Sequence, residues 1–206
     1  MSKSNGMGRH RPDFAAIASW IGIGSSVLDL GCADGTLLRY LQATRKTSGY
    51  GVEIDDASIL ACVKNGVNVV QSDLERGLSG FEDNSFDYVV LSQTIQAMKN
   101  SEIIIREMLR VGREGIVTFP NFGYWKNRLE VMKGRMPVSE NLPYEWFDTP
   151  NVHLCAIADF ERFCLERDIR ILERKVLTHG KAVGMLPNLL GALAVYHFGN
   201  GKAARP

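Results

Sequence analysis

The stretch Val27-Leu28-Asp29-Leu30-Gly31-Cys32-Ala33-Asp34-Gly35 decides how this chain folds. Its first four residues are mostly apolar and are followed at once by glycine, which is the pattern of a buried parallel strand. From Thr36 to Gln42, the leucines Leu37, Leu38 and Leu41 recur at helical spacing. The stretch therefore predicts a strand, a glycine-rich turn and a helix. Such a turn lets backbone N–H groups approach a ligand, and the helix points its positive end at the same place.

Strands and helices alternate on both sides of this turn. A helix is expected from Pro12-Asp13 to Gly22, with Phe14, Ile17 and Ile21 on one face. Further strands are expected at residues 49–54, 67–71, 86–92 and 115–119, and helices at 57–65 and 102–111. With right-handed crossovers, this order predicts a doubly wound parallel sheet.

The second half of the chain is less regular. Residues 120–155 are rich in Pro, Gly and aromatic side chains, and the part from Met136 to Val152 is expected to be an ordered loop or lid. Asp159 is then expected to cap a helix, and Ile169–Leu177 and Leu193–Phe198 to form a terminal antiparallel hairpin. The predicted fold is α/β, a Rossmann-like, doubly wound, mostly parallel sheet of seven strands. The predicted organisation is a flexible tail over residues 1–11 and a single domain over 12–206, with a lid or insertion at about 121–155.

Composition excludes several classes of function. The 206 residues carry 24 basic and 23 acidic side chains, a net charge of +1, so no general attraction to nucleic acid or to anionic membranes is expected. The four cysteines form no C-x-x-C pair, and no metal site is predicted. Met1–His10 lacks the apolar core of a signal peptide, and Leu186–Phe198 is too short to span a membrane. We expect a reduced, cytoplasmic, soluble protein.

Two acidic residues follow the glycine turn at intervals of about one strand and one helix. Glu53 ends the second strand, 22 residues after Gly31, and Asp73 lies just past the third strand, 20 residues later. Ligands of parallel α/β sheets bind beyond the carboxyl ends of the strands, where strand order reverses. Glu53 could accept the ribose hydroxyls of a nucleoside, and Asp73 the amine of its base. The alternative is a turn that serves only as a helix cap.

Four motifs in order resemble those of class I S-adenosylmethionine-dependent methyltransferases. They are V-L-D-L-G-C-A-D-G, G-V-E-I-D, Q-S-D-L and F-D-Y-V-V-L-S. The resemblance implies S-adenosylmethionine or S-adenosylhomocysteine as cofactor, with the turn at Gly31 against the methionyl part, Glu53 on the ribose and Asp73 on the adenine. The cofactor-binding residues implied are Asp29, Gly31, Cys32, Ala33, Glu53, Ile54, Asp73, Leu74 and Ser92. The alternative cofactor is NAD. Its dinucleotide-binding fingerprint would need glycines where Ala33 and Thr36 stand, so the spacing disfavours it.

No catalytic residue is assigned. Strand 86–92 runs into Gln93-Thr94, without the Asn/Asp-Pro-Pro-Tyr/Phe signature of amino-methylating nucleic-acid enzymes. Candidate bases for methyl transfer are His153 and His179, with Tyr124 and Glu145 behind them. Each histidine is more typical of a surface or packing residue.

Further segments resemble the methionine-biosynthesis protein MetW family across residues 12 to about 200. The most distinctive are T-F-P-N-F-G-Y-W-K-N-R, G-R-M-P-V-S and L-P-Y-E-W-F-D-T-P-N-V-H. The resemblance implies a methyltransferase architecture used in methionine synthesis beside a homoserine O-acyltransferase, either an O-acetyltransferase or an O-succinyltransferase. Two functions follow: an accessory protein that binds and activates this acyltransferase, with residues 121–152 as the first candidate for the partner surface, or a small-molecule methyltransferase.

Overall fold

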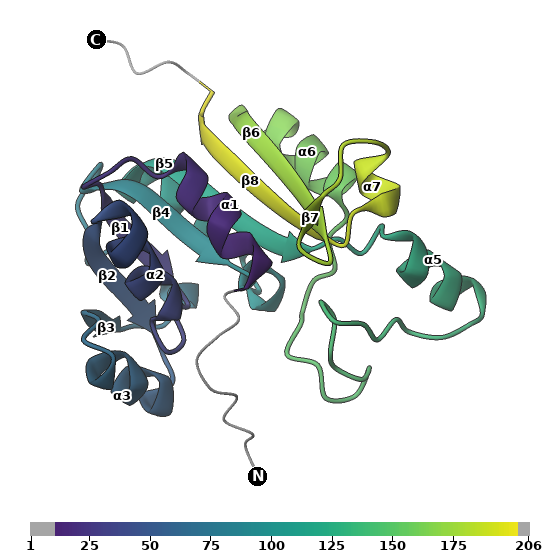
Figure 1. Cartoon of the computed structure of the whole chain (residues 1–206), viewed down its shortest axis with the longest axis horizontal. Coiled ribbons are helices and arrows are strands. Elements are labelled where there is room, and N and C mark those ends of the chain that lie inside the picture. Colours follow the sequence, from purple (N-terminus) through teal and green to yellow (C-terminus); the bar gives the residue numbers. More distant parts are fainter. Residues whose placement is uncertain (1–10, 202–206) are drawn as a thin grey trace.

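The computed structural model describes residues 11–201, which form one eight-stranded sheet with helices on both faces (Figure 1). Apart from Arg11, the tail expected over residues 1–11 lies outside the described residues. The strands lie in the order β3-β2-β1-β4-β5-β8-β6-β7. Their bounds are β1 Ser26–Leu30, β2 Ser48–Glu53, β3 Val69–Gln71, β4 Phe86–Ser92, β5 Gly112–Pro120, β6 Ile169–Thr178, β7 Lys181–Ala182 and β8 Leu193–Asn200.

Strand β1 lies at the point where strand order reverses. It pairs in parallel with β2 on one side and with β4 on the other, so that Leu28 lies opposite both Tyr50 and Val89. Four of its five residues are buried, as expected of a central parallel strand. The glycine turn therefore leaves the sheet at the crevice where ligands of doubly wound folds bind.

The last strands reverse direction. Strand β8 lies between β5 and β6 and pairs antiparallel with both, which confirms the predicted mostly parallel sheet with a C-terminal antiparallel hairpin. The structure adds an eighth strand, β7, which has only two residues and pairs with the end of β6. Two residues are too few to show a period in sequence, so this strand was not predicted.

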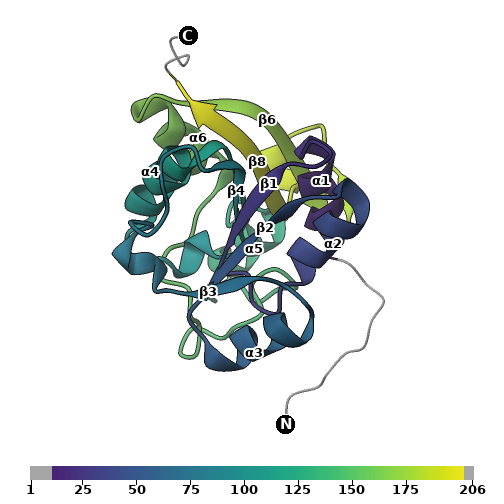
Figure 2. The same cartoon turned by 90° about the vertical axis from the view of Figure 1, so that its left-hand side faces the viewer.

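Helices cover the two faces with separate cores (Figures 1 and 2). Helices α1 (Pro12–Trp20), α2 (Thr36–Arg45) and α3 (Asp56–Lys64) contribute to one core, and α4 (Ser101–Val111) and α6 (Ile157–Glu166) to the other. Successive strand residues point to opposite faces, so Val27 and Val90 belong to the first core, whereas Leu28 and Val89 belong to the second. The predicted apolar face of α1 is buried in the first core.

Three predicted element starts are corrected. Strand β3 begins at Val69 rather than at residue 67, because the Val67 N–H still donates to the Cys62 carbonyl of α3 at 2.9 Å. Helix α6 begins at Ile157, and Asp159 is its third residue, whose carboxylate accepts the N–H of the N-cap residue Ala156 at 3.3 Å. Asp159 still satisfies an end of the helix, but from inside it. Strand β5 begins at Gly112, because this residue passes directly from α4 into extended backbone and lies opposite Phe86 of β4.

The segment 121–155 contains helix α5 (Trp125–Met132) and a long loop that projects beside the sheet in Figure 1. The side chain of Asn121, which is 0% exposed, holds its base. Its amide nitrogen donates to the carbonyls of Asn188 and Gly191, and its oxygen accepts the N–H groups of Gly123 and Ile157. One asparagine thus joins the start of the segment to α6 and to helix α7 (Pro187–Leu190).

The interpretation of this segment as a lid stays a prediction. Across residues 11–201, no helix has the length and apolarity that a bilayer span requires.

Candidate functional site

The turn after β1 depends on residues with left-handed backbone. Gly31, Ala33 and Gly35 have φ of +69°, +49° and +75°. At Gly31 a Cβ atom would lie 2.8 Å from the Thr94 hydroxyl, so both the backbone conformation and the close neighbour require glycine. Ala33 carries a Cβ in a region that costs roughly 1–2 kcal/mol for such residues. Something must hold this residue in place.

Glu53 supplies that restraint from the end of β2. Its Oε2 accepts the Ala33 N–H at 2.9 Å, and its Oε1 accepts the N–H groups of Ile54 at 2.8 Å and Asp55 at 3.1 Å. A carboxylate offers about four acceptor positions, so roughly one remains for a ligand hydroxyl. The main role of Glu53 in this structure is therefore to hold the backbone of the turn. Its position in the sequence did not predict that role.

The third predicted strand end lies beside the second. The N–H of Ser72 donates to the Glu53 carbonyl at 3.0 Å, which brings Asp73 to the same edge of the sheet. The Asp73 carboxylate accepts the Glu75 N–H at 3.0 Å and caps the short helix η1 (Leu74–Arg76). Leu74 packs against the core. Ile54, which directly follows Glu53, is 59% exposed and offers an apolar surface at this edge.

A cavity of about 240 Å³ opens at the turn. Of the nine predicted cofactor-binding residues, five line it: Asp29, Gly31, Cys32, Ala33 and Ser92. The other four lie outside its lining, at the ends of β2 and β3. By the measure of a 150 Å³ cavity that holds benzene, this one holds roughly ten non-hydrogen atoms. That size matches the amino-acid end of S-adenosylmethionine rather than the whole molecule.

Asp29 is the least satisfied polar group of the cavity. It is 2% exposed, and its Oδ1 accepts no hydrogen bond from the residues that the structure describes. Burial raises its pKa from the ordinary 3.8 to about 7, with Arg11 acting in the opposite direction and Asp13 and Glu53 adding to the rise. A buried carboxylate without a donor calls for a cationic or hydrogen-bonding ligand.

Arg11 and Phe14 also line this cavity, and the sequence did not identify them as site residues. The Arg11 guanidinium forms an ion pair with Asp13 and donates to the Ser92 hydroxyl at 2.5 Å. Its side chain remains 43% exposed. Arg11 precedes α1, and only the packing of this helix brings it to a strand end some eighty residues later, so no local signal could have indicated it.

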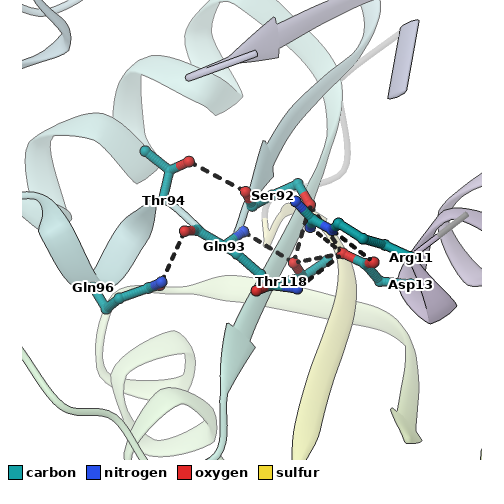
Figure 3. A network of polar contacts seen from close by, with 7 residues as sticks. All are labelled: Arg11, Asp13, Ser92, Gln93, Thr94, Gln96 and Thr118. Carbon is teal, nitrogen blue, oxygen red and sulfur yellow. Dashed lines mark hydrogen bonds and ion pairs between the residues drawn. The ribbon is translucent and has the colours of Figure 1, made fainter. Parts of the chain in front are cut away.

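Asp13 connects the ends of β4 and β5 (Figure 3). Its carboxylate is buried and accepts the hydroxyls of Ser92 at 3.0 Å and Thr118 at 3.3 Å. The Thr118 hydroxyl in turn accepts the Gln93 N–H at 3.0 Å. Ser92, predicted to bind cofactor, therefore lies at the cavity but has its hydroxyl bonded within the chain.

The two cysteines near the turn act as packing residues. Cys32 and Cys62 are buried free thiols with sulfurs 3.7 Å apart, and the Cys62 thiol donates to the Ala33 carbonyl at 3.0 Å. Burial raises the pKa of the Cys32 thiol, which keeps it protonated and unreactive. A Cβ at Gly51 would lie 2.2 Å from the Cys32 sulfur, so the fit is tight.

The candidate bases lie outside this cavity's lining. The His153 Nε2 lies 3.2 Å from the Lys99 carbonyl, and the exposed His179 pairs with Glu140 at 3.4 Å. Tyr124 is buried and Glu145 is exposed. Among residues 11–201, no group of three or more His, Cys, Asp or Glu side chains could hold a metal ion.

Comparison with known proteins finds one matching family and a similar protein. The family described as "Methionine biosynthesis protein MetW" matches residues 11–198. The bifunctional methionine biosynthesis protein MetXA/MetW of Rhodopirellula baltica is 41% identical over 157 residues, which are 71% of this chain and 25% of that protein. The chain thus spans about a quarter of the length of this relative.

Solved structures share the fold. An S-adenosylmethionine-dependent methyltransferase of Mesorhizobium loti matches with a TM-score of 0.68 and 13% identity, over 91% of this chain and 97% of that one. A TehB-like methyltransferase of Corynebacterium glutamicum matches with a TM-score of 0.62 and 14% identity, over 92% and 87%. At these identities the likeness shows the class I methyltransferase fold alone.

Proposed function

This chain belongs to the methionine biosynthesis protein MetW family, and on that premise we propose that it binds S-adenosylmethionine and supports a homoserine O-acyltransferase partner. The observation that carries the proposal is the bifunctional MetXA/MetW protein of R. baltica, in which we take MetXA to be the homoserine O-acyltransferase component. Two activities joined in one chain are held at high effective concentration, which suits partners that act together.

The glycine-turn cavity supports the cofactor part of the proposal. Asp29 lines the cavity and its carboxylate suits the ammonium of the ligand's amino-acid end, and the Arg11 guanidinium suits its carboxylate. The nucleoside would then extend over the ends of β2 and β3, toward Ile54 and Asp73. When bound, S-adenosylmethionine supplies an activated methyl group. The chain's own residues orient and enclose the ligand.

A sensing role fits these residues better than methyl transfer. The hydroxyls at the ends of β4 and β5 both donate to the buried Asp13, and neither histidine candidate lines the cavity. For the ligand to regulate the partner, it must bind the free and the partnered chain with different affinities. S-adenosylmethionine, made from methionine, would then report on supply. A small-molecule methyltransferase remains the alternative function.

The segment 121–155 supports the partner part of the proposal. Eleven of the twenty-two exposed large hydrophobic residues of the described chain lie in its thirty residues from 125 to 154. They are Trp125, Leu129, Val131, Met132, Met136, Val138, Tyr144, Trp146, Phe147, Val152 and Leu154. Concentrated exposed aromatic and Met side chains are typical of protein interfaces.

The test is co-purification with a homoserine O-acyltransferase, together with an assay of its rate and stability with and without this chain. We expect the chain to raise one or both. The double variant Trp146→Ala/Phe147→Ala should lose the effect, because these rings are 72% and 70% exposed. Leu165→Ala, at an 82% exposed position on α6, is the matched control and should keep the effect. An unchanged rate and stability with wild-type chain would refute the partner proposal.

A further inference from the structure

The segment 121–155 contains two parts of opposite charge. Residues 125–136, which comprise helix α5 and the turn after it, carry four basic side chains and one acidic side chain. Residues 137–155 carry three acidic side chains and no lysine or arginine. We call these the basic part and the acidic part. The whole chain has 24 basic and 23 acidic residues, so this separation of charge is local.

The two parts do not neutralise each other. Within residues 11–201, no ion pair joins the basic part to the acidic part. Lys133 pairs with Glu130 at 2.8 Å inside the basic part, and Glu140 pairs with His179 at 3.4 Å outside the segment. Four exposed charged residues of the segment have no ion pair in the described part of the chain: Lys126, Arg135, Glu145 and Asp148.

Charges of mixed sign elsewhere on the surface do pair within the chain. On α6, Arg162 pairs with Asp159 at 3.1 Å, and Glu161 pairs with Arg174 of β6. Such pairs need no second protein. The unpaired charges of the segment, in contrast, are available to one.

The fold holds the acidic part in place at both ends. Pro137 and Leu142 are buried before its most exposed stretch. After that stretch, the N–H groups of Val152 and His153 donate to the Gln96 carbonyl at 2.8 Å and 3.0 Å. In Figure 1 the loop of the acidic part and helix α5 project on the same side of the sheet. One partner could therefore meet both parts.

The acidic part places its carboxylates next to its most exposed aromatic rings. Trp146 and Phe147 are 72% and 70% exposed, and their ring centroids lie 5.7 Å apart. In sequence they stand between Glu145 and Asp148. A guanidinium or ammonium group is attracted both by a carboxylate and by the face of an aromatic ring. Basic side chains of a partner therefore suit this part.

We propose that the surface of the homoserine O-acyltransferase that docks on this segment carries the complementary charges. Its basic groups lie opposite Glu145 and Asp148, and its acidic groups lie opposite Lys126 and Arg135. The inference rests on the proposed partner and adds the orientation in which the two proteins meet. A partner turned end for end would set like charges against each other, which disfavours binding.

Neutral variants of each part test this complementarity. They are Glu145→Gln/Asp148→Asn and Lys126→Gln/Arg135→Gln, each titrated calorimetrically with the purified acyltransferase of the same organism. We expect each to bind about fivefold more weakly than wild type at about 50 mM NaCl, and the difference to shrink at about 500 mM by screening. Glu82→Gln, at an exposed position in the loop before β4, is the control and should bind as wild type does. Because all five side chains are exposed, the variants should unfold at the wild-type temperature.

The two double variants together distinguish the kinds of partner. A partner surface of a single sign would bind one variant more weakly and the other more tightly than wild type. That result would overturn the proposal while the partner function stands, and so would unchanged binding of both variants. If the wild-type chain binds no acyltransferase, the proposed partner function fails and the inference fails with it. A wild-type chain that forms a dimer in sedimentation, weakened in both variants and not displaced by the acyltransferase, would assign the surface to a second copy and also overturn the proposal.

Discussion

Two regions of the molecule are built in opposite ways: the sheet edge at Gly31 and Glu53, where β1 and β2 end, and the segment 121–155. We call the first region the glycine-turn edge. At the edge, buried parallel strands fix the backbone, and a carboxylate satisfied by three N–H groups holds the turn. The segment has one short helix and exposed apolar side chains, and the buried side chain of Asn121 joins its base to α6 and α7. A site that must hold a small ligand needs a rigid frame, whereas a surface that meets a protein can expose apolar groups.

The largest expected effect concerns the edge and is a dependence on pH. Folded Asp29 keeps its proton up to about pH 7, whereas the unfolded chain releases it near 3.8, so the native state binds the extra proton between these values. The contribution of Asp29 to stability should therefore fall as pH rises from about 4 to 7 and then level off. Asp29→Asn should lack this fall, and the difference between variants should change by up to about 4 kcal/mol.

Denaturant unfolding of both proteins at pH 4 and pH 8 measures this change. Asp148→Asn, in the exposed loop of the second region, is the control and should leave the pH dependence of wild-type stability as it is. An Asp29→Asn variant whose stability follows wild type across this range would show that Asp29 is not held protonated by burial.

The next largest effect should come from the base of the segment. Asn121→Ala removes four hydrogen bonds and leaves buried backbone groups of both Gly123 and Ile157 without partners. We expect a loss of about 3 kcal/mol in the free energy of unfolding. Asn68→Ala, at an exposed position in the loop before β3, should stay within about 0.5 kcal/mol of wild type. Similar values for the two variants would mean that the segment is held by other contacts.

A smaller effect separates close packing from backbone conformation in the turn. Gly31→Ala should cost about 2 kcal/mol, because φ is positive and the new methyl group meets Thr94. Gly24→Ala has a similar φ of +78° but nothing within 4 Å, so it should cost only about 1 kcal/mol. Adding Thr94→Ala to Gly31→Ala should restore the stability lost to the clash, which is the difference between the costs of the two glycine variants. Thermal unfolding of the four proteins checks this, and no recovery would exclude the clash.

Features with a local sequence pattern could be predicted, whereas contacts between distant residues could not. The strands around the turn have local patterns, so the sheet and its reversal point were predicted and are confirmed. The roles of Asp13 and Arg11 at Ser92 were not, because they arise from contacts about eighty residues apart. Glu53 was placed at the correct strand end, but its bonds to backbone N–H groups depend on turn geometry that residue spacing does not encode. The link from Asn121 to α6 and α7 likewise joins distant segments.

Cofactor binding at the glycine turn is tested by calorimetric titration of S-adenosylmethionine into the wild-type chain and Glu53→Ala at pH 8, where Asp29 is ionised. We expect measurable binding to wild type and an affinity lower by about tenfold or more in the variant, because loss of the carboxylate releases Ala33 and removes an acceptor for a ligand hydroxyl. Equal affinity in both proteins would remove Glu53 from the site. No binding to wild type would contradict the proposal that this turn holds S-adenosylmethionine.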